Sequence, residues 1–221
     1  LQFQLGTLML KQQSSGQTGI AMSKSTTIQD FYDNLPFSLT NAQQKAIHAI
    51  CKDLCGQKPM NRLLQGDVGS GKTAVAAAAA AFAAKNGMQT VLMAPTEILA
   101  QQHMQTMTDF LTPIGIQPVL LTGSTKAKEK REIKKKIADG SASVVVGTHA
   151  VIQKDIEFAS LGLVITDEQH RFGVAQRAAL AEKGGYPHKL VMSATPIPRT
   201  LALIIYGDLD ITVLDEMPKG R

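Results

Sequence analysis

The sequence predicts an α/β fold with a mostly parallel sheet that is covered by helices on both faces. Short runs that are apolar throughout alternate along the chain with longer segments of helical periodicity. Strands without polar alternation are typical of a parallel sheet that is buried on both sides. Polar motifs follow several of these runs directly, and such sheets bind ligands at the C-terminal ends of their strands. We therefore expect one binding edge to which several strands contribute.

The first expected strand, which contains Leu63 and Leu64, leads into a loop with the spacing G-x-x-x-x-G-K-T. An alanine-rich helix is expected after it, over residues 72–85. This order of strand, loop and helix distinguishes a phosphate-binding loop from a chance glycine-rich turn. Its glycines let backbone N–H groups turn toward a polyphosphate, while Lys72 supplies positive charge and Thr73 a hydroxyl for Mg²⁺. The residues assigned to this nucleotide site are Gly66, Asp67, Gly69, Ser70, Gly71, Lys72 and Thr73.

Two adjacent acids follow the apolar strand expected over residues 161–166. Asp167 is placed to hold Mg²⁺ at the rim of the sheet, and Glu168 to orient and deprotonate a water for in-line attack on a phosphate. A solvated turn is the simpler explanation of adjacent acids, but the strand before them and the phosphate-binding loop favour the catalytic one. His170 is either an ordinary hydrogen-bonded histidine or a residue that couples the nucleotide to Ser193 and Thr195, and we favour coupling.

Three other expected strand ends carry small hydroxyl residues. Such turns can bind nucleic-acid phosphates through N–H and hydroxyl groups without reading the base sequence. Ser and Thr are also common at these positions simply as helix caps. Because the three motifs are spaced along one sheet, we predict a DNA-binding edge composed of Pro95, Thr96, Glu97, Gly123, Ser124, Gly147, Thr148 and His149.

Gln43 lies three residues after Thr40, which is the spacing of a capping box at the start of a helix. A side-chain amide can also donate to and accept from the edge of adenine. Both interpretations stay open at this point, and the second one assigns Gln43 to the nucleotide site.

Composition limits the class of protein and its partners. The 221 residues, 44% of them hydrophobic, suffice for one large domain with a buried core. A net charge of +5 is compatible with an acidic partner such as nucleic acid, whereas the lack of Trp disfavours a base-stacking platform. No run reaches the roughly 20 apolar residues of a membrane span, so we expect a cytoplasmic location. Cys51 and Cys55 are expected to be free thiols.

A basic segment contains seven Lys and Arg residues between positions 126 and 136, against two acids. Ile133 and Ile137 lie on one helical face of this segment. The pattern favours the solvated outer face of a covering helix over a dedicated DNA contact.

Two parts are expected along the chain, an N-terminal helix and flexible connection over residues 1–34 and the main domain over residues 35–221. Leu1, Leu5 and Leu8 have helical spacing, and residues 14–25 are rich in Ser, Gly, Gln and Thr. Because the chain begins at Leu1 and ends at Arg221 soon after a strand-like run, we expect it to be a piece of a longer protein.

The order of these motifs resembles the first RecA-like motor domain of superfamily 2 helicases. Within that superfamily, residues 66–73, 167–173 (DEQHRFG) and 194–201 (ATPIPRTL) are similar to the RecG family of bacterial DNA helicases, over roughly residues 35–221. The transcription-repair coupling factor is a close relative, but it tends to carry Glu where this chain has Gln169. Residues 1–13 resemble the helix that joins a DNA-binding wedge domain to the motor in the RecG family.

The resemblance implies ATP and Mg²⁺ as cofactors, with the adenine at Gln43, the phosphates at Lys72 and Thr73, and the metal at Asp167. It also implies that Ser193, Ala194, Thr195 and Arg199 couple hydrolysis to motion. The implied partners are branched or duplex DNA, as at stalled forks and Holliday junctions in recombination and repair, and a wedge domain and second motor domain of the same full-length chain.

The isolated fragment should bind nucleotide weakly and hydrolyse it hardly at all, because the second motor domain would supply an arginine finger worth about 10³ to 10⁵ in rate. Two other classes of function remain. A P-loop kinase or NTPase for small molecules would need an acceptor-binding lid, and no segment is an obvious lid. A nucleic-acid-binding module with a vestigial nucleotide site is disfavoured by the intact Lys72, Asp167 and Glu168.

Overall fold

A computed structural model describes residues 19–153, 155–167, 186–195 and 209–218 of the chain. Seven strands in this part form one sheet in the order β3-β4-β2-β5-β6-β1-β7, and every neighbouring pair is parallel. The predicted parallel sheet is therefore confirmed. The strands are β1 (Asn61–Gly66), β2 (Gln89–Met93), β3 (Val119–Leu121), β4 (Val144–Gly147), β5 (Leu161–Asp167), β6 (His188–Ser193) and β7 (Asp210–Leu214).

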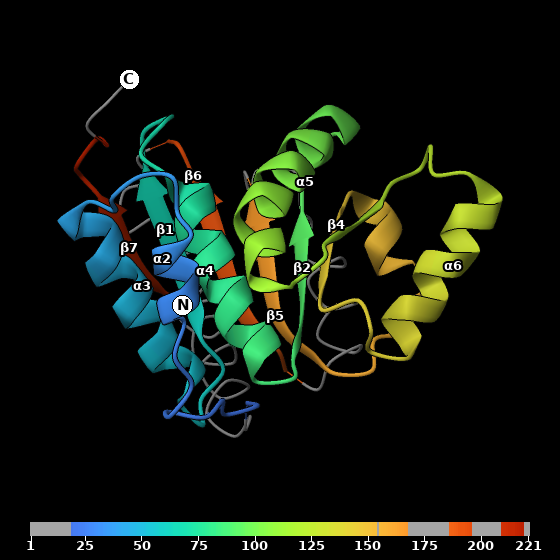
Figure 1. The fold of residues 1–221 in the computed structure, drawn as a ribbon, viewed down its shortest axis with the longest axis horizontal. Helices are drawn as coiled ribbons and strands as arrows, with labels where there is room; N and C mark the ends of the chain where they lie inside the picture. Colours follow the sequence, from blue (N-terminus) through green and yellow to red (C-terminus); the bar gives the residue numbers. More distant parts are fainter. Residues whose placement is uncertain (1–18, 154, 168–185, 196–208, 219–221) are drawn as a thin grey trace, which may run out of the picture.

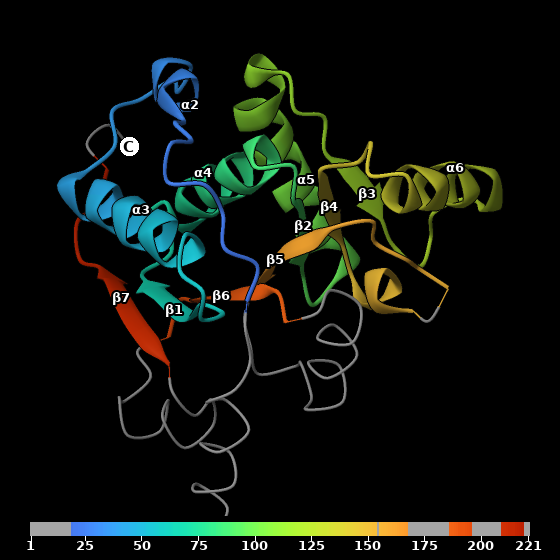
Figure 2. The same cartoon turned by 90° about the horizontal axis from the view of Figure 1, so that it is seen from below.

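One face of the sheet is covered by α3 (Asn41–Leu54), α4 (Lys72–Lys85) and α5 (Glu97–Leu111), which lie side by side in Figures 1 and 2. Alternate strand residues point to these helices, since Leu64, Leu92, Leu163 and Leu190 share a buried cluster with them. The short helices α2 (Gln29–Asp33) and η1 (Thr112–Ile114) belong to the same side of the molecule. Alternate side chains of each strand thus lie on opposite faces of the sheet, as the two-residue repeat of a β-strand requires.

The central helix α4 is buried continuously from Ala74 to Ala83. It lies between α3 and α5 and against the sheet (Figure 1). Small side chains allow a helix to pack this closely on all sides. The alanine-rich segment is therefore core, as its composition predicts, and it begins at the end of the phosphate-binding loop.

The opposite face of the sheet carries a second buried cluster, in which Val91, Val145 and Val164 contact α6 (Ala127–Ala138) and η2 (His149–Ile152). The helix α6 lies at the β3 end of the sheet (Figure 2). It contributes Ile133 and Ile137, and most of its basic side chains are exposed. The predicted amphipathic character of residues 126–136 is confirmed.

The packed body of the domain begins upstream of the boundary expected at residue 35. Met22, Ile28 and Phe31 are buried in the main core, and the Met22 N–H donates to the Leu54 carbonyl. Residues 19–25, expected in a flexible connection, are therefore held against α3 by backbone bonds and apolar contacts. The helix expected over residues 1–13 lies outside the described residues.

Candidate functional site

The phosphate-binding loop joins the C-terminal end of β1 to the first residue of α4. Gly69 and Gly71 have φ angles of 87° and 84°, in the left-handed region that glycine adopts without strain. The Lys72 Nζ atom donates to the carbonyl oxygens of Gly66 and Asp67 at 2.6 and 2.9 Å. The lysine thus lies across the loop, with its charge at the C-terminal edge of the sheet and at the N-terminus of α4, where an anion binds favourably.

Gln43 holds the loop from the side of α3. Its Oε1 accepts from the Thr40 N–H at 2.9 Å, and the Thr40 hydroxyl accepts from the Gln43 N–H at 3.2 Å. Its Nε2 donates to the Ser70 carbonyl at 2.8 Å. Because Gln43 is fully buried and both ends of its amide are engaged, the capping-box interpretation is confirmed. A contact between Gln43 and adenine stays a prediction.

The Ser70 hydroxyl indicates whether the loop can bind a polyphosphate. Its side chain is buried, yet its Oγ has no hydrogen-bond partner among the described residues. A buried hydroxyl without a partner is costly, so a ligand oxygen or a water is expected there. Together with Lys72 and the Thr73 hydroxyl at the start of α4, this loop fits the phosphates of a nucleotide and a magnesium ion.

Asp167 ends β5 at the same edge of the sheet. It lies opposite Met192 of β6, and on the other side of β6 the β1 residue Gln65 lies opposite Ser193. The phosphate-binding loop and Asp167 are thus separated by one strand, or about 10 Å at roughly 4.8 Å per strand spacing. The topology brings together the two groups that the sequence predicts to share one ion-bound nucleotide. Glu168 and His170 lie outside the described residues.

His103 on α5 contacts the acid that ends β5. Its Nε2 lies 2.6 Å from Asp167 Oδ2, and the two side chains are only 11% and 16% exposed. Since an ionised carboxylate only accepts, the imidazole N–H is the donor. Sequence analysis did not find this contact. The available signal was a histidine on the helical stripe formed by Ala100, Met107 and Leu111, which faces the core.

The residues predicted to couple hydrolysis to motion form a compact turn after β6. Ser193 is buried, and its Oγ lies 3.1 Å from the Thr195 hydroxyl and accepts from the Thr195 N–H at 3.2 Å. Because β6 lies between β1 and β5, this turn lies between the phosphate-binding loop and Asp167. Its position fits the predicted role. Arg199 lies outside the described residues.

The three hydroxyl-bearing strand ends follow β2, β3 and β4, which are adjacent in the sheet. Thr96 caps α5, because its side chain accepts from the Leu99 N–H. Glu97 accepts from the N–H and the hydroxyl of Ser124 at 3.0 and 2.7 Å. The turn after β2 is thereby tied to the turn after β3. In the described structure the Glu97 carboxylate fixes the Ser124 turn, and a carboxylate is unsuited to bind a phosphate directly.

The third strand end is crowded by backbone. A Cβ on Gly147 would lie 2.1 Å from the Leu121 carbonyl oxygen, so only glycine lets β3 and β4 approach here. Thr148 is half-buried with its N–H donating to Leu121, whereas His149 is exposed in η2. Of this motif, the exposed His149 is accessible to a ligand, and Gly147 has a packing role.

The basic helix α6 is partly neutralised by neighbouring residues. Lys134 forms an ion pair with Asp155, and the Lys134 ammonium lowers the pKa of that carboxyl. Lys130 donates to the Gln153 side chain. These contacts support the interpretation of α6 as a solvated outer face.

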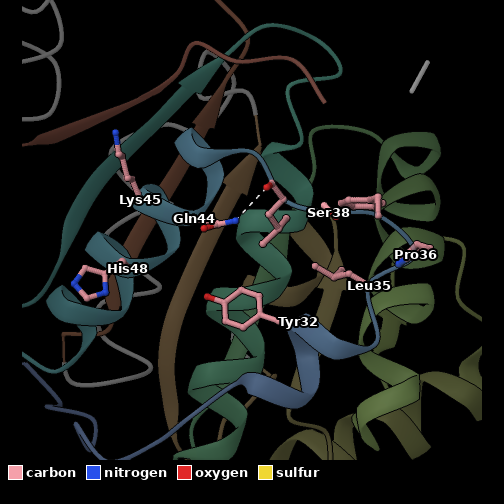
Figure 3. Close-up of a pocket in the computed structure, with 9 residues that line it drawn as sticks. Tyr32, Leu35, Pro36, Ser38, Gln44, Lys45 and His48 are labelled. Carbon is pink, nitrogen blue, oxygen red and sulfur yellow. Dashed lines mark hydrogen bonds between the residues drawn. The ribbon is translucent and has the colours of Figure 1, made fainter. Parts of the chain in front are cut away.

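A pocket of about 950 Å³ lies between α2, the segment after it and α3 (Figure 3). Gln44 donates across its wall to the Leu39 carbonyl. Among the described residues, none of those predicted for nucleotide or DNA binding lines it. Its walls are formed by Tyr32, Leu35, Pro36, Phe37, Ser38, Leu39, Gln44, Lys45 and His48.

Other chemistry finds little support in the described part of the chain. No cluster of His, Cys, Asp and Glu suitable for a protein-only metal site occurs among these residues. Cys51 and Cys55 are both free thiols, as predicted. Within the same residues, no helix combines the length and apolar character that crossing a bilayer requires.

Comparison with known families gives a match over most of the chain. Residues 40–204 match the family model described as DEAD/DEAH box helicase. The chain is 51% identical over 222 residues to the ATP-dependent DNA helicase RecG of Aquifex aeolicus (strain VF5), and the alignment covers 99% of this chain and 28% of the relative. It is 55% identical over 193 residues to RecG of Thermotoga maritima, covering 87% of this chain and 25% of the relative. The chain thus spans between a quarter and a third of these relatives.

Solved structures agree with this similarity. A structure of RecG bound to a three-way DNA junction matches with a TM-score of 0.86 and 47% identity, over 99% of this chain and 30% of that one. The helicase MrfA bound to DNA matches with a TM-score of 0.65 and 18% identity, over 89% of this chain and 30% of that chain. At that identity the second match shows a shared fold only.

Proposed function

The chain belongs to the DEAD/DEAH box helicase family, and on that basis we propose that it is the ATP-binding motor domain of a DNA helicase that remodels branched DNA. The observation that carries the proposal is the shared edge of the sheet, where the phosphate-binding loop and Asp167 are one strand apart. The similarity to RecG, one structure of which holds a three-way DNA junction, supports the choice of DNA substrate.

ATP with Mg²⁺ supplies, when bound, the phosphoanhydride whose hydrolysis releases the free energy for movement. Lys72 and the N–H groups of the loop bind the negative phosphate oxygens. The Thr73 hydroxyl and the Asp167 carboxylate would hold the metal, and Glu168 would orient a water and accept its proton. Ser193 and Thr195 lie between these groups and couple ATP hydrolysis to movement of the protein.

The DNA phosphates contact the turns after β2, β3 and β4 in this proposal, at the same edge of the sheet. These turns contain Thr96, Gly123, Ser124, Thr148 and the exposed His149. None of them implies a base-specific contact, which suits binding of any sequence. A wedge domain and a second motor domain of the same full-length chain complete the helicase, which acts in the cytoplasm.

ATP hydrolysis by the full-length protein tests this proposal. We expect forked DNA to stimulate the rate more than linear duplex of the same length, at matched salt. Glu168→Gln should abolish unwinding while ATP binding is retained. A rate that is indifferent to any DNA would instead indicate a small-molecule kinase or NTPase, and normal unwinding by Glu168→Gln would indicate a vestigial site.

A further inference from the structure

The described strands divide the binding edge into two halves. The turns after β3, β4 and β2 carry the predicted DNA contacts, and β5, β6 and β1 carry the nucleotide groups, in an unbroken sheet order. The boundary falls between β2 and β5. Asp167 is the last residue of β5, and α5 is the helix that follows β2.

A hydrogen bond between side chains crosses this boundary at the level of Asp167. His103 extends from α5, and its Nε2 is 2.6 Å from Asp167 Oδ2. Its partner atom is one carboxylate oxygen, Oδ2, and among the described residues no side chain donates a hydrogen bond to the other oxygen, Oδ1. Both side chains are largely shielded from water, which strengthens a charge-assisted hydrogen bond and fixes the carboxylate plane.

The helix that carries His103 begins at the DNA half. Thr96 caps α5 and Glu97 ties its first turn to Ser124. His103 lies six residues after Glu97, or about 9 Å along a helix that rises 1.5 Å per residue. Its inward face, with Ala100 and Met107, is packed in the core.

We propose that His103 is the positioning residue for Asp167, and that α5 thereby links the DNA-binding turns to the carboxylate that holds the metal. The inference rests on the proposed function, because it takes Asp167 as a metal ligand. The imidazole N–H orients one oxygen and leaves the other for the ion. Groups that orient metal ligands in this way are worth about 10-fold to 100-fold in metal affinity.

Binding of a fluorescent ATP analogue to the full-length protein, titrated with Mg²⁺, tests this role without turnover. His103→Ala should raise the Mg²⁺ concentration at half-maximal binding by about 10-fold, with unchanged binding in EDTA. His103→Gln should restore the wild-type midpoint, because its Nε2–H can replace the imidazole donor. Thr106→Ala, on the same helix, removes a hydroxyl that donates to the Gln102 carbonyl and should behave like the wild type.

Two outcomes contradict the positioning role. The first is a wild-type Mg²⁺ midpoint in His103→Ala. The second is an equal loss of binding with and without Mg²⁺, which would mean that the histidine merely supports the fold. Failure of the proposed function is distinguishable, because the wild-type protein would then show no Mg²⁺-dependent nucleotide binding at all.

The link to DNA has its own readout in the same titration. Forked duplex should shift the Mg²⁺ midpoint of the wild-type protein, and His103→Ala should lose that shift while it still binds the duplex. A shift that persists in His103→Ala, or no shift in the wild-type protein, would contradict transmission through α5.

Discussion

At the scale of single residues, the polar side chains that join distant segments matter more than the exposed charges. Gln43, Glu97 and His103 each connect two motifs that are far apart in the sequence, and each is held by side-chain hydrogen bonds of 3.0 Å or less. Sequence analysis identified both Gln43 and Glu97 as site residues. It left the capping box and the adenine contact open for Gln43, and it predicted a DNA contact for Glu97. A pattern of residue types indicates where a polar group lies along the chain, but it cannot show which partner across the fold occupies it.

Gln43→Ala distinguishes the two interpretations of that residue. Loss of its bonds to Thr40 and Ser70 should lower the free energy of unfolding by about 1 to 3 kcal/mol. Because the phosphate-binding loop loosens, we expect ATP and GTP affinity to fall by the same factor. Chemical denaturation and nucleotide titrations measure both quantities, with the exposed neighbour variant Gln44→Ala as the control. A loss confined to ATP would show that Gln43 reads the adenine.

Glu97→Ala tests whether this carboxylate supports the DNA-binding edge. Both bonds to Ser124 are lost, so forked-duplex affinity should fall about fivefold, equivalent to about 1 kcal/mol. Fluorescence anisotropy at fixed salt measures the affinity, with the exposed Gln101→Ala on the same helix as the control. Tighter binding would show instead that Glu97 only repels the DNA phosphates.

At the scale of elements, the pattern of strands and helices was predictable because each motif begins where an apolar run ends. The helix α4 occupies the residues predicted for it. Within residues 116–121, strand β3 begins only at Val119, because Pro118 cannot donate a hydrogen bond to a neighbouring strand. Helix α2 was missed because five residues are too few to show helical periodicity.

The segment over residues 19–25 was expected to be flexible because its composition is typical of linkers. Its attachment depends instead on partners distant in the sequence. His188 at the start of β6 is fully buried, accepts from the Met60 N–H through Nδ1 at 2.9 Å, and lies 2.8 Å from the Ile20 carbonyl through Nε2. The neutral imidazole, with its hydrogen on Nε2, satisfies both contacts. No pattern within residues 19–25 could have revealed these contacts with His188.

His188 makes stability depend on pH. Burial lowers the pKa of His188 below its ordinary value, against smaller raising effects of the Ile20 carbonyl and Asp53. The unfolded chain therefore binds the proton more readily than the folded one. The stabilisation is complete above about pH 6.5 and is lost as the pH falls through the lowered folded pKa.

Chemical denaturation between pH 7.5 and about pH 5 checks this dependence. The His188→Asn variant, which keeps an acceptor for Met60 but cannot take a proton, should lose this part of the slope. The exposed His48→Asn should keep it. An unchanged slope in His188→Asn would contradict the assignment.

At the scale of the whole molecule, one topological fact organises the site. Seven parallel strands place the described strand-end motifs at one edge. The turns predicted to bind DNA follow β3, β4 and β2, and the predicted nucleotide groups follow β5, β6 and β1. The common edge was predictable, because parallel strands that alternate with helices end on the same side. The order of the strands along that edge was not, because strand order depends on packing between distant segments. The division into two halves, and the contact of His103 with Asp167 at their boundary, became visible only in the fold.

The central claim is that one magnesium-bound nucleotide is held between Lys72 and Asp167. Binding of a fluorescent ATP analogue to Lys72→Ala and Asp167→Asn, with Mg²⁺ and with EDTA, tests it most directly. We expect Lys72→Ala to lose affinity under both conditions, and Asp167→Asn to lose only the gain that Mg²⁺ provides. An Asp167→Asn variant whose binding still responds to Mg²⁺ as the wild type does would contradict the claim.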